Sequence, residues 1–216
     1  MSPLRLNIGC GMTVTHGWHN YDNSLSVRLA GLPAVLRTGL TTARLISHEQ
    51  AGFIAFCRTH DVRYCNAARR IPHADTSVDA VYSSHMLEHL SRADAAGFLG
   101  EASRVLRPGG VIRIAVPDLK LAVDTYLADG DADKLMEYLL VSAPPIDTAA
   151  QKLKLLAMGY RHHQWMYDGA SLCKLLAEHG FKDAATQPPG VTMIGDPGAL
   201  DLHERSDVSV YVEARK

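Results

Sequence analysis

The chain has 216 residues, of which 47% are hydrophobic and 21% charged, a composition typical of one large soluble globular domain over residues 1–216. Its formal net charge of −1 argues against a nucleic-acid binder that depends on neutralising phosphates, and no apolar run is long enough to predict a membrane span. The four cysteines form no CxxC pair and the N-terminus has no signal-peptide pattern, so we expect reduced thiols in a cytoplasmic protein.

The first predicted element is a short apolar strand over Leu4–Ile8, followed at once by Gly9-Cys10-Gly11. Glycine has no Cβ, so it adopts unusual backbone angles and lets a ligand approach the main chain closely. In open α/β sheets, nucleotide-like ligands bind beyond the carboxyl ends of the strands. The sequence therefore predicts a ligand-binding turn at Gly9 and Gly11.

The remaining chain alternates short strand-like segments with longer segments that have helical periodicity. The expected strands after the first are His19–Asp22, Val62–Cys65, Asp79–Ser83, Val111–Val116, Ala184–Gln187 and Val208–Glu213. Helical insertions are expected at 25–60 and at 119–160. This alternation predicts an α/β fold with a Rossmann-like, doubly wound, mainly parallel sheet and helices on both of its faces. Because no helix separates the last two strands, the sheet should end in an antiparallel strand.

Two helices have clear start signals. Ser91 and Asp94 resemble a capping box with Asp in place of Glu, and the apolar residues that follow recur at helical spacing until Pro108-Gly109-Gly110 ends the helix. Asp168 is expected to cap a second helix, for which Gly180 provides the stop.

Three stretches in register resemble the class I S-adenosylmethionine-dependent methyltransferases. They are Leu6–Gly11, similar to the glycine-rich motif of that family, Asp79–Leu90 and Val105–Ile114. The stretches 163–168 and 209–214 are similar to one bacterial branch of predicted methyltransferases. The resemblance implies a seven-stranded sheet with an antiparallel last strand, and S-adenosylmethionine as the methyl donor.

The resemblance also implies which residues bind this donor. The backbone of Gly9, Cys10 and Gly11 would contact its methionyl part, and Asp22 would accept hydrogen bonds from both ribose hydroxyls. A turn or capping role is the alternative for Asp22. The other expected binding residues are Asn7, where the family carries an acidic residue, Asn66 near the adenine, and Ser83 and Ser84 beside the methionine moiety. Only ten residues separate Gly11 from Asp22, so we expect a short helix or an irregular turn there.

His85, Glu88 and His89 share one face if a helix follows the fourth strand. We assign them, with His163, to the catalytic site, and His85 is the preferred general base. The trio has metal-ligand chemistry and is similar to the Glu-x-x-Glu-His sites of small-RNA 2′-O-methyltransferases and ubiquinone-pathway O-methyltransferases, to which His162 or His163 would add a ligand. Capping, packing or acid–base roles are the simpler interpretation, so no metal is assigned and a metal-assisted reaction is the alternative.

The expected activity is in-line methyl transfer to a hydroxyl of a small molecule or saccharide, with O-methylation favoured over N-methylation and no nucleic-acid partner. A non-catalytic protein that binds S-adenosylmethionine is a second possibility. An NAD-dependent oxidoreductase is disfavoured, because position 14 is Val where its fingerprint requires a third glycine, and Asp22 comes too early.

Overall fold

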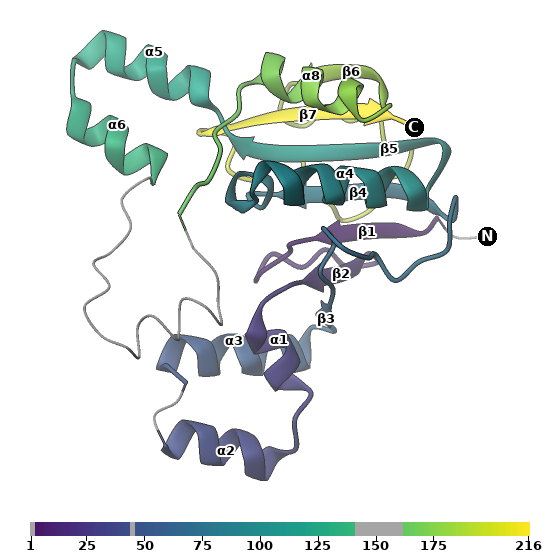
Figure 1. Ribbon diagram of the computed structural model, residues 1–216, viewed down its shortest axis with the longest axis vertical. Coiled ribbons are helices and arrows are strands. Elements are labelled where there is room, and N and C mark those ends of the chain that lie inside the picture. The colour runs from purple at the N-terminus through teal and green to yellow at the C-terminus, as the bar shows by residue number, and fades with distance from the viewer. Residues whose placement is uncertain (1–2, 44–45, 141–161) are drawn as a thin grey trace.

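The computed structural model describes residues 3–43, 46–140 and 162–216, and these residues include a seven-stranded sheet with the order β3-β2-β1-β4-β5-β7-β6 (Figure 1). The strands are β1 (Arg5–Ile8), β2 (His19–Asp22), β3 (Arg63–Tyr64), β4 (Val78–Ser84), β5 (Leu106–Pro117), β6 (Lys182–Gln187) and β7 (Ser209–Arg215). β1 to β5 run parallel to one another, whereas β7 is antiparallel to both β5 and β6. The predicted fold class and the antiparallel last strand are thereby confirmed.

The helices occupy the segments in which helical periodicity was expected. They are α1 (Leu25–Ala30), α2 (Ala34–Thr42), α3 (His48–Thr59), the 3-10 helix η1 (Leu87–His89), α4 (Arg92–Val105), α5 (Leu119–Asp129), α6 (Ala132–Leu139) and α8 (Gly169–Glu178). Within the described ranges, no helix combines the length and apolar character needed to cross a bilayer. α1 to α3 lie in the expected 25–60 insertion and α5 and α6 in the 119–160 insertion, of which 141–160 fall outside the described residues.

Both predicted helix starts are confirmed. The Ser91 side chain accepts a hydrogen bond from the Asp94 amide at the start of α4. Asp168 caps α8 in a full capping box with Ser171, and Gly180 follows the helix with a φ of +84°. These side chains pair backbone groups that a helix end leaves without a partner.

The core lies on both faces of the sheet, and alternate strand residues supply its two halves. Val81 and Ile112 point toward α4 and α8, which cross one face in Figure 1 and bury Phe98 and Leu172 against it. On the other face, a separate cluster packs against the sheet. Its buried members are Trp18, Ala80, Tyr82, Val111, Ile194 and Leu200. The loop between β6 and β7 therefore covers part of this second face.

One strand differs from the sequence-based expectation in where it begins. Strand β5 begins at Leu106 rather than Val111, so Pro108-Gly109-Gly110 lies inside the strand at a register shift against β4. Gly109 allows this shift with a φ of +77°, and its amide donates to the carbonyl of Lys216. The link between Gly11 and His19 contains turns, which is one of the two forms expected from its short spacing.

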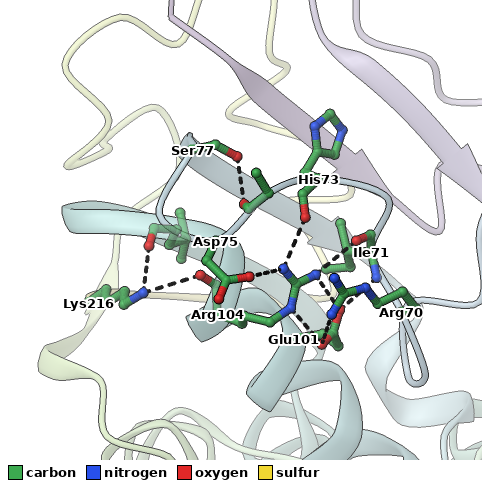
Figure 2. Close-up of polar contacts among 10 residues, drawn as sticks. Arg70, Ile71, His73, Asp75, Ser77, Glu101, Arg104 and Lys216 are labelled. Atoms are coloured by element: carbon green, nitrogen blue, oxygen red, sulfur yellow. Dashed lines mark hydrogen bonds and ion pairs between the residues drawn. The ribbon is translucent and has the colours of Figure 1, made fainter.

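The loop that leads into β4 is held by one arginine of α4 (Figure 2). The Arg104 guanidinium donates to the carbonyls of Ile71 and His73 at 2.9 and 3.0 Å. It also pairs with Asp75 at 2.6 Å and with Glu101 at 2.7 Å. This fork of hydrogen bonds fixes the start of β4 relative to α4, and therefore the far end of β4 where the candidate site lies.

Candidate active site

The glycine turn stands at the carboxyl end of β1. Gly9 and Gly11 have φ values of +74° and +50°, in the left-handed region that favours glycine. The amides of Gly9 and Cys10 both donate to the Tyr21 carbonyl, at 2.8 and 3.0 Å. A Cβ on Gly9 would lie 2.5 Å from Cγ of Met86, whereas a Cβ on Gly11 would have no heavy-atom neighbour within 4 Å. Gly11 thus borders open space among the described residues.

Asp22 ends β2 beside this turn. One carboxylate oxygen accepts from the Gly11 amide at 3.1 Å, and the other accepts from the Ser24 amide at 2.7 Å. The second contact is the turn role considered for this residue, and the first ties Asp22 to the glycine turn. Each oxygen has a further lone pair, so these contacts leave acceptor capacity for ribose hydroxyls.

The Asn7 side chain, in β1, contacts the loop that follows the glycine turn. Its side chain is 2% exposed, and its NH₂ group lies within hydrogen-bond distance of the Thr13 carbonyl, the Thr15 hydroxyl and the Asn20 side-chain oxygen. A neutral amide suits this position because its two N–H groups donate toward these oxygen atoms, a task that a carboxylate cannot perform. The geometry explains how Asn7 shapes the loop in place of an acidic residue.

Ser83 and Ser84 end β4, the strand next to β1. Both hydroxyls are buried, and no hydrogen-bond partner for either lies among the described residues. Buried polar atoms are nearly always paired, so each of these hydroxyls has capacity for a further partner. Asn66 follows β3, is half-buried, and accepts backbone hydrogen bonds from Arg69 and Arg70 through its carbonyl.

The four predicted catalytic residues gather around one carboxylate. Oε1 of Glu88 lies 3.6 Å from Nδ1 of His85, 3.9 Å from Nε2 of His89 and 4.0 Å from Nε2 of His163. The first three residues lie at the end of β4 and in η1, and His163 is contributed by a segment far along the chain. The grouping that the sequence predicted is therefore present in the structure.

Backbone hydrogen bonds hold this distant segment against η1. The carbonyl of Glu88 accepts from the amides of Gln164 and Trp165, at 2.7 and 3.2 Å. The Gln164 side chain donates to the carbonyl of His89. At the other end of the cluster, the His85 amide donates to the Ala115 carbonyl of β5, and His85 itself has a φ of +48°. Such backbone strain in a non-glycine residue occurs preferentially at functional sites.

Burial dominates the electrostatics of the cluster. It raises the pKa of Glu88, which is 1% exposed, to about 7. It lowers the pKa of His85 to about 4, and the nearby positive charge of Arg205 acts in the same direction. Burial also lowers the pKa values of His89 and His163. All three imidazoles are consequently neutral near pH 7 and able to accept a proton or bind an ion.

Two residues that act on the His85 cluster were not predicted from the sequence. The Ser209 hydroxyl lies 2.8 Å from Nε2 of His85, and the exposed Arg205 acts electrostatically on His85 and Glu88. Ser209 reaches His85 because β7 inserts antiparallel beside β5, with Ser209 opposite Pro117. No local pattern signals a contact between residues 124 positions apart, and only the strand order reveals it.

A pocket also lies between α5 and α6, beyond the carboxyl end of β5. Its walls include Leu121, Tyr126 and Tyr138, together with Asp207 and Val208 from the segment before β7. The Tyr138 hydroxyl donates to the carbonyl of Val208 at 2.8 Å, which joins the pocket to the strand that carries Ser209.

Known proteins share parts of this sequence and its fold. Residues 40–114 match the family model described as a methyltransferase domain. A probable S-adenosylmethionine-dependent methyltransferase of Mycolicibacterium smegmatis is 45% identical over 58 residues, which are 27% of this chain and 21% of that relative. The match therefore spans about a fifth of the length of the curated relative.

Two solved structures share the fold at 16% identity and a TM-score of 0.50. One is an S-adenosylmethionine-dependent methyltransferase of Thermotoga maritima, described as a possible histamine N-methyltransferase, and the similarity covers 100% of this chain and 83% of that one. The other is a methyltransferase of Methanosarcina mazei, for which the coverage is 98% and 91%. Residues 40–114 thus match a methyltransferase domain, and the chain is similar to S-adenosylmethionine-dependent methyltransferases in part of its sequence and in its fold.

Proposed function

We propose that the protein transfers a methyl group from S-adenosylmethionine to a hydroxyl of a small molecule or saccharide. One observation carries the proposal. The glycine turn with Asp22 and the cluster around His85 follow the adjacent parallel strands β1 and β4, so they share one edge of the sheet. This edge is where open α/β sheets bind their ligands.

The residues at this edge suit the proposed donor. Gly11 borders open space, Asp22 retains acceptor capacity for two hydroxyls, and the Ser83 and Ser84 hydroxyls have no partner among the described residues. Bound S-adenosylmethionine would supply an electrophilic methyl group on a sulfonium. The task of the chain is to hold the acceptor in line with that methyl, and such positioning is worth about 7–11 kcal/mol.

The preference for a hydroxyl acceptor rests on His85. A hydroxyl oxygen must lose its proton as it attacks, whereas a neutral amine already presents a free lone pair. The neutral imidazole of His85, oriented through the Ser209 hydroxyl at 2.8 Å, would accept this proton. A base built into the site is therefore more useful for O-methylation than for N-methylation.

Calorimetric titration with S-adenosylmethionine and its demethylated product tests the binding half of the proposal. We expect both compounds to bind, and Asp22→Ala to weaken binding by at least about tenfold, in line with the loss of charged hydrogen bonds. Asp183→Asn, at an exposed position on the outer strand β6, is the matched control and should bind normally. Folded protein that binds neither compound would contradict the proposal.

Transfer of labelled methyl groups to pooled acceptors tests the catalytic half. Polyol and saccharide pools should be labelled in preference to amine pools, and the label should resist the mild alkali that hydrolyses methyl esters. Preferential labelling of amines would refute the hydroxyl assignment. Tight binding without transfer to any pool would favour the non-catalytic alternative.

A further inference from the structure

The Glu88 carboxylate poses a chemical problem that the proposed methyl transfer does not solve. Its side chain is 1% exposed, and neither oxygen has a hydrogen-bond partner among the described residues. Burying a carboxylate without partners is costly, and the usual solutions are a paired cation, a metal ion or protonation. Around it lie the ring nitrogens of His85, His89 and His163, all within 4.0 Å of Oε1.

Hydrogen bonding fixes the tautomer of one of these rings. Nδ1 of His89 lies 3.3 Å from the carbonyl oxygen of His162, which can only accept, so Nδ1 carries the hydrogen. In the neutral ring Nε2 then has a free lone pair, and this atom faces Glu88 at 3.9 Å. Two electron-pair donors thus face each other across a gap that a cation would fill.

We propose that Glu88, His89 and His163 form a binding site for a divalent transition-metal ion such as Zn²⁺. The donor atoms of these three residues all lie within 4.8 Å of one another. Since zinc lies about 2.0–2.2 Å from nitrogen and oxygen ligands, two ligands of one tetrahedral ion are about 3.3–3.6 Å apart. The 3.9 and 4.0 Å separations from Glu88 are slightly longer than this distance, so small side-chain rotations would bring the three donor atoms around one ion.

The ligand chemistry selects the class of ion. Two imidazoles and one carboxylate suit Zn²⁺ and its first-row neighbours, whereas Mg²⁺ and Ca²⁺ prefer sites made of oxygen ligands. Two histidines and one glutamate also form the protein ligand set of open catalytic zinc sites, in which water or substrate takes the remaining position. The contact of His89 with a backbone carbonyl is the outer-shell hydrogen bond that such ligands usually make.

His85 stands beside this trio and outside it. Its Nε2 bonds the Ser209 hydroxyl, and its Nδ1 lies 3.6 Å from the Glu88 carboxylate. The proposal therefore leaves His85 as the base of the methyl-transfer reaction and gives its neighbours a separate task. The ion would also fasten the segment that carries His163 onto η1. Its binding can be measured without any methyl acceptor, so it does not depend on the proposed function.

Direct binding to chelator-treated protein tests the site. Titration with Zn²⁺ should show one ion per chain, and Co²⁺ should give the visible absorption of a low-coordinate nitrogen and oxygen site. Glu88→Gln and His163→Gln keep nearly the same shape but remove a ligand, so each should weaken binding by at least about 100-fold, since even outer-shell changes cost about 10–100-fold. His60→Gln, at the exposed end of α3, is the matched control and should bind the ion as the parent does.

Circular dichroism and urea unfolding will confirm that each variant is folded. Folded parent protein that takes up no Zn²⁺ or Co²⁺ overturns the proposal. So does undiminished binding in both ligand variants, or loss that occurs on His85→Gln and not on His163→Gln. Should one ligand variant fail to fold, the other and the cobalt spectrum of the parent decide. Loss of cofactor binding with intact metal binding would count against the proposed function alone.

Discussion

At the scale of single residues, the two glycines of the binding turn have different reasons to be glycine. Both have positive φ, which costs other residues about 1–2 kcal/mol. Only Gly9 also lacks room, because Met86 packs against the position of its missing Cβ. A side chain on Gly11 would instead enter the open space proposed for the cofactor. The same residue type therefore serves packing at one position and ligand access at the other.

This difference predicts that alanine at position 9 mainly lowers stability, whereas alanine at position 11 mainly weakens cofactor binding. Gly9→Ala should destabilise the protein by about 2–4 kcal/mol, because steric strain adds to the unfavourable φ. Gly11→Ala should cost only about 1–2 kcal/mol but should weaken cofactor binding more than its stability loss suggests. Urea unfolding and calorimetry measure the two effects. Equal stability losses in both variants would contradict the role given to Met86.

His85 should affect turnover and leave cofactor affinity unchanged. We expect His85→Gln to lower kcat by about 10²–10⁴-fold, the usual contribution of a general base, with little change in the Kd of S-adenosylmethionine. Ser209→Ala should give a smaller loss, because it removes only the partner that orients the ring at 2.8 Å. Steady-state kinetics with any accepted substrate checks both variants. Full turnover by His85→Gln would remove this residue from the mechanism.

At the scale of elements, one helix side chain supports the strand that bears the site. Arg104 is 18% exposed and joins α4 to the loop before β4 through two carbonyls and the Asp75 carboxylate, and it also pairs with Glu101 of its own helix. Arg104→Ala would leave the carbonyls of Ile71 and His73 without this donor, so we expect a loss of about 2–4 kcal/mol in the free energy of unfolding. Arg104→Lys keeps the charge but not the planar fork, and should recover only part of the loss. Chemical denaturation of both variants measures these losses. An Arg104→Ala variant as stable as the parent would contradict the role given to Arg104.

Elements with strong local signals could be predicted from the sequence, and those set by distant contacts could not. The strand His19–Asp22 and the caps Ser91 and Asp168 lie where they were expected, because alternation and capping are local properties. The early start of β5 was missed. Its Pro-Gly-Gly segment continues the sheet only because the backbone of Lys216, at the far end of the chain, bonds to Gly109 and Gly110.

In the candidate site too, residues close in sequence could be predicted and those set by the strand order could not. Residues close in sequence, such as His85, Glu88 and His89, could be grouped by spacing alone. His163 was considered as a further ligand from the C-terminal half of the chain, and the structure brings it to Glu88. Ser209 could not be found, since its distance from His85 depends on the position of β7 in the sheet.

At the scale of the whole molecule, a buried ion pair joins the sheet to the loop that covers its second face. Arg113 and Glu213 are fully buried and 2.7 Å apart, and both also bond to the 191–202 loop. Glu213→Gln should destabilise the protein by about 3–5 kcal/mol, because it leaves the arginine charge buried without its partner. The double variant Arg113→Met with Glu213→Leu should recover part of this loss. Urea unfolding measures the stability of both variants. A double variant that is less stable than Glu213→Gln would contradict the stabilising role of the pair.

The stability of the whole chain should also depend on pH through His73. Burial lowers the pKa of His73, and the positive charges of neighbouring groups, namely His19, Arg63 and Arg104, act in the same direction. In the unfolded chain a histidine has a pKa near 6.5, so below about pH 6.5 the unfolded state binds more protons than the folded state. The contribution of His73 is therefore fully present above about pH 6.5 and is lost as the pH falls toward its lowered folded pKa.

A His73→Gln variant isolates this contribution from those of the other histidines. The variant also alters the 2.9 Å contact between His73 and the Tyr21 hydroxyl, so its stability should differ from that of the parent by a constant amount above about pH 7. Below about pH 6.5 the two curves should converge, because only the parent must protonate this ring on unfolding. Urea unfolding from about pH 8 to pH 5 measures both curves. Parallel curves over that range would mean that His73 titrates alike in the folded and unfolded chains, and the neutral buried ring would then have no part in acid unfolding.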